Sequence, residues 1–148
     1  MTSYSVTPWI DTPQERTSAA ALLGTSGRSW HPFVVPGRYT HLEVKKAGEN
    51  GVARWQLDRL RPDDVPPLPA SVAGHGTQLF TWEGGELELR YESVGRTRGF
   101  GVRHQAFDSG EPLDTEVTGT ERGTVRLSGP GYVWVSCLLA GDWTLEVV

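Results

Sequence analysis

The residue types that most often do chemistry are scattered in this chain. The four histidines lie far apart in the sequence and form no recognised metal-site motif with cysteine or carboxylate side chains. They are His31, His41, His75 and His104. The acidic segment from Asp108 to Asp114 lacks the ligand order of an EF-hand calcium loop and is typical of a solvated turn. We therefore predict no metal site and no cofactor.

Nucleophilic catalysis and phosphate binding are equally without a motif. The chain has no Gly-x-Ser-x-Gly elbow and no Cys-His signature, and residues 95–101 lack the Lys-Ser/Thr of a P-loop. Residues 98–101, Arg-Gly-Phe-Gly, match the start of the RNA-recognition motif's RNP1 pattern, but Val102 and Gln105 stand where that pattern requires aromatic rings. We predict no catalytic residue and no binding of nucleic acid.

Net charge, hydropathy and cysteine content disfavour nucleic acid and membranes as partners and indicate the compartment. The formal net charge of −4 gives no overall attraction to nucleic acid or to an anionic membrane. The longest apolar run, from Tyr132 to Leu139 and broken by Ser136, is far shorter than the roughly 18 residues of a membrane span. Cys137 is the only cysteine, and its apolar neighbours predict a buried, inert thiol. We predict a soluble cytoplasmic protein, or a secreted one if a signal has been removed.

Aromatic and arginine side chains supply the candidate binding surface. The chain has six tryptophans, and three of them, Trp55, Trp82 and Trp143, lie in phase with or next to apolar residues as core side chains do. Trp134 differs, because Val133 and Val135 occupy one face of its strand and leave Tyr132 and Trp134 on the other. A second layer, residues 1–30 or a partner must cover that face, or it is an open platform. The predicted ligand or partner surface comprises Tyr132, Trp134, Arg96, Arg98 and Arg103.

The elements that must position these residues are strands. Between Glu86 and Glu92 the sequence alternates, which places Leu87, Leu89 and Tyr91 on a core face. Glu83-Gly84-Gly85 predicts a hairpin that joins this strand to residues 77–82. Further strands are expected over residues 39–45, 53–60, 100–107, 115–118, 124–128, 132–139 and 143–148, the last two joined as a closing hairpin.

The first thirty residues differ in composition from the rest. Thr12, Pro13 and Glu15 are typical of a helix start, and Gly24 would end that helix after Leu23, so residues 1–30 are expected to be an arm with a short helix or a mobile terminus. Residues 31–148 are expected to form a single β domain, with the proline-rich stretch 61–74 as a connection inside it. The predicted fold is all-β: a mostly antiparallel, jelly-roll-like β-sandwich or a closed sheet.

The end of the chain resembles a known family. A strand that starts at Gly131-Tyr132, a short turn and a final Gly-Asp-Trp-Thr-Leu-Glu-Val strand at residues 141–147 are similar to the closing hairpin of bacterial pre-peptidase C-terminal-like β-sandwich domains. The resemblance covers about residues 77–148 and implies a noncatalytic appendage, often of a secreted protein.

Three classes of function fit these observations. The first is a noncatalytic binding or protein-interaction module with an unknown protein or small-molecule partner. The second is a small β-barrel enzyme, such as an isomerase or cyclase, whose pocket carries no motif. The third is an accessory subunit of a larger assembly. The sequence does not predict an oligomeric state.

Overall fold

The computed structural model describes residues 3–9, 21–23, 32–35, 37, 41–47, 56, 58–94, 100–113, 117–118, 121–137 and 141–148. The elements in these ranges are β1 (Ser3–Trp9), β2 (Ala21–Leu23), β3 (His41–Ala47), the 3-10 turn η1 (Pro62–Asp64), β4 (Ser71–His75), β5 (Gln78–Trp82), β6 (Leu87–Val94), β7 (Phe100–Gln105), β8 (Val117–Thr118), β9 (Arg122–Leu127), β10 (Gly131–Cys137) and β11 (Asp142–Val147). Within these ranges no helix is long and apolar enough to cross a membrane.

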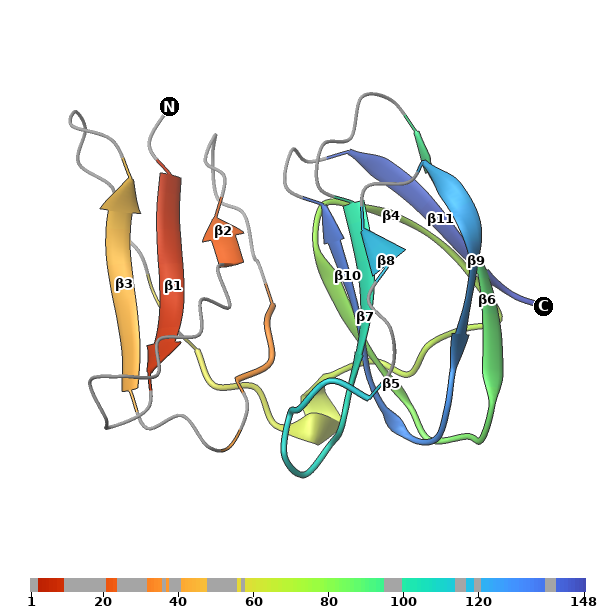
Figure 1. Cartoon of the computed structure of the whole chain (residues 1–148), viewed down its shortest axis with the longest axis horizontal. Coiled ribbons are helices and arrows are strands. Elements are labelled where there is room, and N and C mark those ends of the chain that lie inside the picture. Colours follow the sequence, from red (N-terminus) through yellow and green to blue (C-terminus); the bar gives the residue numbers. More distant parts are fainter. Residues whose placement is uncertain are drawn as a thin grey trace.

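Eight of the strands build a β-sandwich (Figure 1). One sheet has the order β5-β10-β7-β8 and the other has the order β4-β11-β6-β9, and all neighbours within them are antiparallel. From β4 onward the chain changes sheet at every connection except the one between β7 and β8, which is the double Greek-key pattern of a jelly roll. The predicted all-β sandwich is therefore confirmed, and the sheets do not close into a barrel.

The sandwich core lies between the inner faces of its two sheets. Leu87, Leu89 and Tyr91 of β6 are buried there, as their alternation predicts. Val133 and Val135 of β10 meet them from the opposite sheet and are completely buried. Burial of the inward residues fixes the register of each strand, because a slip of one residue would move the apolar set to the solvent face.

The hairpin predicted between residues 77–82 and 86–92 is wrong. β5 pairs with β10, whereas β6 pairs with β11 and β9, so residues 83–86 carry the chain from one sheet to the other. The indole Nε1 of Trp82 donates to the carbonyl of Gly85 at 3.0 Å, and its ring occupies the space that a Cβ on Gly84 would need. A glycine-rich link between alternating strands is thus compatible with either a hairpin or a crossing between sheets, and here the crossing allows both apolar faces to be buried.

The closing hairpin predicted from residues 132–139 and 143–148 is also wrong, because its two strands do not pair with each other. β10 and β11 lie at the predicted places in the sequence, but they belong to different sheets. Trp143 and Leu145 of β11 are buried, while Thr144 and Glu146 are exposed, in agreement with the predicted faces.

The strand predicted over residues 53–60 is also absent from the described part of that range. Residues 56 and 58–60 belong to no strand and are exposed, while residues 53–55 and 57 lie outside the described residues. The proline-rich connection then runs along the edge of β5, where Leu68 N–H donates to Thr81 O at 2.8 Å and Thr81 N–H donates to Pro66 O at 2.9 Å. Proline lacks an amide hydrogen, so only the other residues of this stretch can donate to the edge strand.

A separate three-stranded antiparallel sheet has the order β2-β1-β3 and is drawn on the left of Figure 1. Ala21–Leu23 form β2, so the helix predicted from Thr12 to Leu23 is wrong for its last three residues, and residues 12–20 lie outside the described ranges. Pairing of β2 with β1 supplies hydrogen-bond partners for backbone N–H and C=O groups that would lack them at the end of a helix. Because β1 pairs with β3, this sheet joins residues from both sides of the expected boundary at residue 30, and the division into arm and domain stays a prediction.

Candidate functional site

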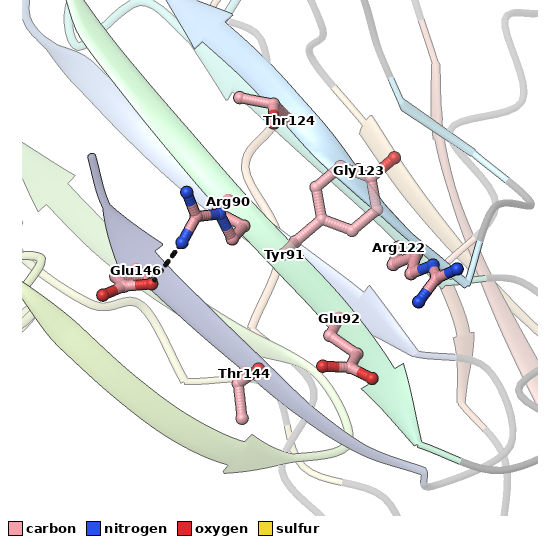
Figure 2. A pocket seen from close by; sticks show the side chains of 8 residues that line it. All are labelled: Arg90, Tyr91, Glu92, Arg122, Gly123, Thr124, Thr144 and Glu146. Carbon is pink, nitrogen blue, oxygen red and sulfur yellow. Dashed lines mark hydrogen bonds and ion pairs between the residues drawn. The ribbon is translucent and has the colours of Figure 1, made fainter.

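A hollow of about 610 Å³ lies on the outer face of the β4-β11-β6-β9 sheet (Figure 2). Three adjacent strands supply its lining, and most of the lining side chains are exposed, so the hollow opens to solvent. The lining residues are Arg90, Tyr91, Glu92, Arg122, Gly123, Thr124, Thr144 and Glu146.

Strand alternation places the charged and threonine side chains of the lining on the outside. Leu89 and Tyr91 of β6 point into the core, so Arg90 and Glu92 must point outward. Arg90 stands opposite Glu146 of β11 and opposite Thr124 of β9. Glu92 stands one row further along, between Thr144 of β11 and Arg122 of β9. The hollow is therefore two neighbouring cross-strand rows of polar side chains on a rigid sheet.

One ion pair crosses the hollow, and a second lies next to it. Arg90 Nη1 donates to Glu146 Oε2 at 3.2 Å, and outside the hollow Arg126 Nε donates to Glu88 Oε2 at 2.8 Å. The hydrogen bond and the charge of Glu88 hold the pKa of Arg126 above its ordinary value. These pairs place each of two arginine side chains beside a carboxylate on the face.

Four lining side chains have no such partner. Within the described ranges, Arg122, Glu92, Thr124 and Thr144 make no side-chain hydrogen bond or ion pair, and no dashed line joins Arg122 to Glu92 in Figure 2. The hollow thus offers a cation, an anion and two hydroxyl groups that are free to contact a ligand.

The strand backbone under the hollow is backed by the core. The ring of Tyr91 leans over Gly123, its cross-strand partner, and a Cβ on Gly123 would meet the tyrosine hydroxyl. The same ring stacks on Phe100 of the opposite sheet, with ring centroids 5.4 Å apart. Because Tyr91 is buried in the sandwich core, the two strands beneath the hollow are held rigidly together.

Trp134 lies on the outer face of the other sheet, where it is covered. Only 7% of its surface is exposed, because Phe33, Val34, Val65 and Leu79 pack around it. Of the alternatives predicted for this face, the structure shows a covered face and not an open platform, and the described cover comes from residues 33, 34, 65 and 79 of the chain itself. Trp134 is therefore not part of an open groove.

The structure gathers three of the five predicted surface residues on this face. The Arg103 guanidinium lies 4.7 Å from the centre of the Trp134 ring, in cation–π geometry. Tyr132 is half-buried and meets Phe107 edge to face, with centroids 4.9 Å apart. Arg96 and Arg98 lie outside the described residues. A ligand-binding role for these five residues stays a prediction.

Two polar atoms are buried without a partner on the same face. Among the described residues, neither the Trp134 Nε1–H nor the Gln105 Oε1 finds a hydrogen-bonding group, although Gln105 Nε2 donates to Gly110 O at 2.9 Å. A buried polar group without a partner costs about 1–3 kcal/mol. The two unpartnered atoms therefore lower the stability of the covered face, and a hydrogen bond from solvent or from a ligand would remove that cost.

The two histidines whose side chains the structure describes, His75 and His104, lie in different sheets. His75 Nδ1 lies 2.8 Å from Asp142 Oδ1 in an exposed pair that links β4 to β11, whereas His104 is buried in the other sheet. Across the described part of the chain, no three metal-ligating side chains come together.

Sequence reasoning missed the hollow. Alternation over residues 86–92 does place Arg90 and Glu92 on an outward face. Thr144 and Arg122 are remote in sequence, however, and only the pairing of β6 with β11 and β9 brings them together.

The comparisons with known proteins give no relative. No family model, no curated protein and no solved structure matches this chain.

Proposed function

We propose that this protein is a noncatalytic interaction module of the β-sandwich class, and that its β11–β6–β9 face binds a hydrophilic peptide segment with charges of both signs. The observation that carries the proposal is the set of unpaired groups around the hollow: the Arg122 cation, the Glu92 carboxylate and the hydroxyls of Thr124 and Thr144.

The size and polarity of the hollow support this class of ligand. A volume of about 610 Å³ lies within the usual range of ligand sites, which is roughly 300–1,000 Å³. Most small-molecule sites are lined by apolar side chains, but this hollow is lined mainly by charged residues and threonines. Its ligand would therefore be held by hydrogen bonds and ion pairs, which give specificity more than affinity.

The spacing of the charges favours a peptide over a single ion. Arg122 and Glu92 are cross-strand partners, so opposite charges stand side by side, and the Arg90–Glu146 pair repeats this arrangement in the next row. A lone anion would meet Glu92 and Glu146, and a lone cation would meet Arg90 and Arg122. An extended segment of alternating charge can instead complement both rows.

Amide NMR on the labelled full chain tests the proposal. The probe is a tetrapeptide of alternating lysine and glutamate, and the controls are tetralysine and tetraglutamate. We expect saturable shifts at the amides of Glu92, Arg122, Thr124 and Thr144, which weaken at high salt because exposed charges are screened. Arg122→Gln and Glu92→Gln should abolish the shifts.

Arg126→Gln is the matched control for Arg122→Gln. Arg126 lies on the same face of β9 as Arg122, but outside the hollow. This variant should leave peptide binding unchanged. The proposal fails if the alternating peptide produces no saturable shift at the hollow, or if either single-sign peptide binds there equally well.

A further inference from the structure

Residues 32–35 cover Trp134 without joining the sheet beneath them. These four residues belong to no strand, and within the described ranges they make no hydrogen bond. Phe33 and Val34 pack against the Trp134 cluster but stay half-buried themselves. The next described residue, Gly37, donates its N–H to Ser109 O at 2.6 Å. We call residues 32–35 the covering segment.

The surface under this segment is aromatic, and two of its polar atoms have no hydrogen-bond partner among the described residues. Trp134 and Tyr132 lie on the outward face of β10, and Phe107 packs edge to face on Tyr132. The Trp134 Nε1–H is buried with no acceptor among the described residues, and the Gln105 Oε1 on the neighbouring strand is buried with no donor. Both side chains are more than nine-tenths buried.

We propose that the covering segment opens while the sandwich stays folded, and that the exposed face formed by Trp134, Tyr132 and Phe107 binds planar aromatic compounds that carry a hydrogen-bond acceptor. This inference is independent of the hollow on the opposite sheet. It assigns the covered face as a second, concealed binding site.

The hydrogen-bond inventory explains why opening is local. Release of residues 32–35 breaks no hydrogen bond of their own within the described structure and removes only half-buried apolar contacts. Because Phe33 and Val34 pack against the cluster that contains Trp134, their release would uncover the Trp134 ring, whose buried Nε1–H has no partner among the described residues. By contrast, Val133 and Val135 face the inner core with no exposed surface, and exposing them requires the two sheets to separate. Segments with few buried contacts open at lower free energy than the core strands do.

The ligand class follows from what the open face presents. Aromatic rings favour stacked or edge-to-face contact with another ring, and an indole N–H can only donate. A ligand must therefore combine a planar ring with an acceptor that reaches Trp134 Nε1. Because only the open fraction can bind, the observed affinity is lowered by that fraction, and a change that opens the segment must raise it.

The first experiment measures exchange of the Trp134 indole hydrogen by NMR in the wild-type full chain, with Trp134→Phe used to assign the signal. The reference is the amide of Val135, which lies in the middle of a four-stranded sheet. We expect the indole hydrogen to exchange at least about a hundredfold faster than the Val135 amide, with little dependence on urea. An indole hydrogen that exchanges only as fast as the Val135 amide, with the same urea dependence, overturns the proposal.

The second experiment opens the segment by mutation. Phe33→Ala combined with Val34→Ala removes its packing on Trp134, and Val72→Ala is the matched control, since Val72 is a half-buried valine on the inner core of the sandwich. The probe is 8-anilino-1-naphthalenesulfonate, which has planar rings and acceptor oxygens. We expect the double variant to bind it about tenfold more tightly than wild type, with the largest NMR shifts at Tyr132 and at the Trp134 indole, and Val72→Ala to bind it no more tightly.

Two results of the second experiment contradict the proposal. One is equal probe affinity in wild type and in the double variant, and the other is tighter binding with shifts located away from Tyr132 and Trp134. If the double variant does not fold, Val34→Ala alone replaces it, and the wild-type indole exchange decides the question by itself.

Discussion

The indole of Trp143 in β11 lies against Gly74, its cross-strand partner in β4. A Cβ on Gly74 would overlap three atoms of the indole ring, and the indole Nε1 donates to Gly76 O at 2.7 Å. Trp143 is almost completely buried and packs edge to face on Phe80 of the opposite sheet. The absence of a side chain at position 74 therefore allows the edge strand β4 to close over the core.

Gly74→Ala should lower the free energy of unfolding by about 1–3 kcal/mol, because an added methyl group in a packed core forces the ring or the strand to shift. Urea denaturation followed by circular dichroism measures the change. Gly85→Ala is the control: a Cβ there meets nothing within 4 Å, so its midpoint should stay close to that of wild type. Equal midpoints for the two variants would refute the packing argument.

Comparison of Trp134→Ala with Trp134→Phe should separate the contribution of the Trp134 ring to stability from that of its buried N–H. The alanine variant removes the centre of the cluster formed with Val65 and Leu79 and should cost about 3–5 kcal/mol. The phenylalanine variant keeps a ring under the cover and removes the unpartnered donor, so it should cost less than about 1 kcal/mol or stabilise the fold. Chemical denaturation of both variants provides the comparison, and equal losses would show that the indole N–H carries no penalty.

Cys137 should be unreactive in the folded protein. Its side chain is buried, and its Sγ accepts a hydrogen bond from Gly141 N–H at 3.2 Å. A thiol reagent such as 5,5′-dithiobis(2-nitrobenzoate) can react with Cys137 only after unfolding, because only an accessible thiolate attacks the reagent. We expect negligible labelling in buffer and one equivalent in guanidinium chloride. Complete labelling of the native protein within minutes would contradict the buried placement.

Glu146→Gln should change stability little although it breaks the ion pair with Arg90. Both side chains are more than half exposed, at 56% and 61%, so water and salt screen the attraction. Exposed pairs of this kind contribute about 0–1 kcal/mol. Thermal unfolding in low salt and in 1 M NaCl should give a small difference between variant and wild type that shrinks with salt. A loss above about 2 kcal/mol would assign the pair a structural role.

The sequence predicted the faces of strands better than their partners. Leu87, Leu89 and Tyr91 are buried as their period-two pattern requires, because that pattern depends only on the geometry of one strand. In place of the two expected hairpins, β5 and β6 lie in different sheets, and so do β10 and β11. A short glycine-containing link permits both arrangements, and the choice depends on which pairing buries both apolar faces.

The candidate sites illustrate the same limit. Sequence alone placed Trp134 opposite the core face of its strand and left a cover or an open platform as alternatives. A cover is favoured energetically, since leaving a large apolar ring in water costs free energy. The sequence did not name Phe33, Val34 and Val65 as that cover, because they lie far away in the chain.

The sequence by itself determined an all-β fold, the inward faces of the central strands, and a buried Cys137, since each of these follows from local alternation and composition. Only the tertiary structure decided the sheet order, the covering of Trp134 and the meeting of Glu92 with Arg122 and Thr144. These three features depend on contacts between segments distant in the chain. Such contacts are selected by how two sheets together exclude water from one core, and no single strand's pattern contains that information.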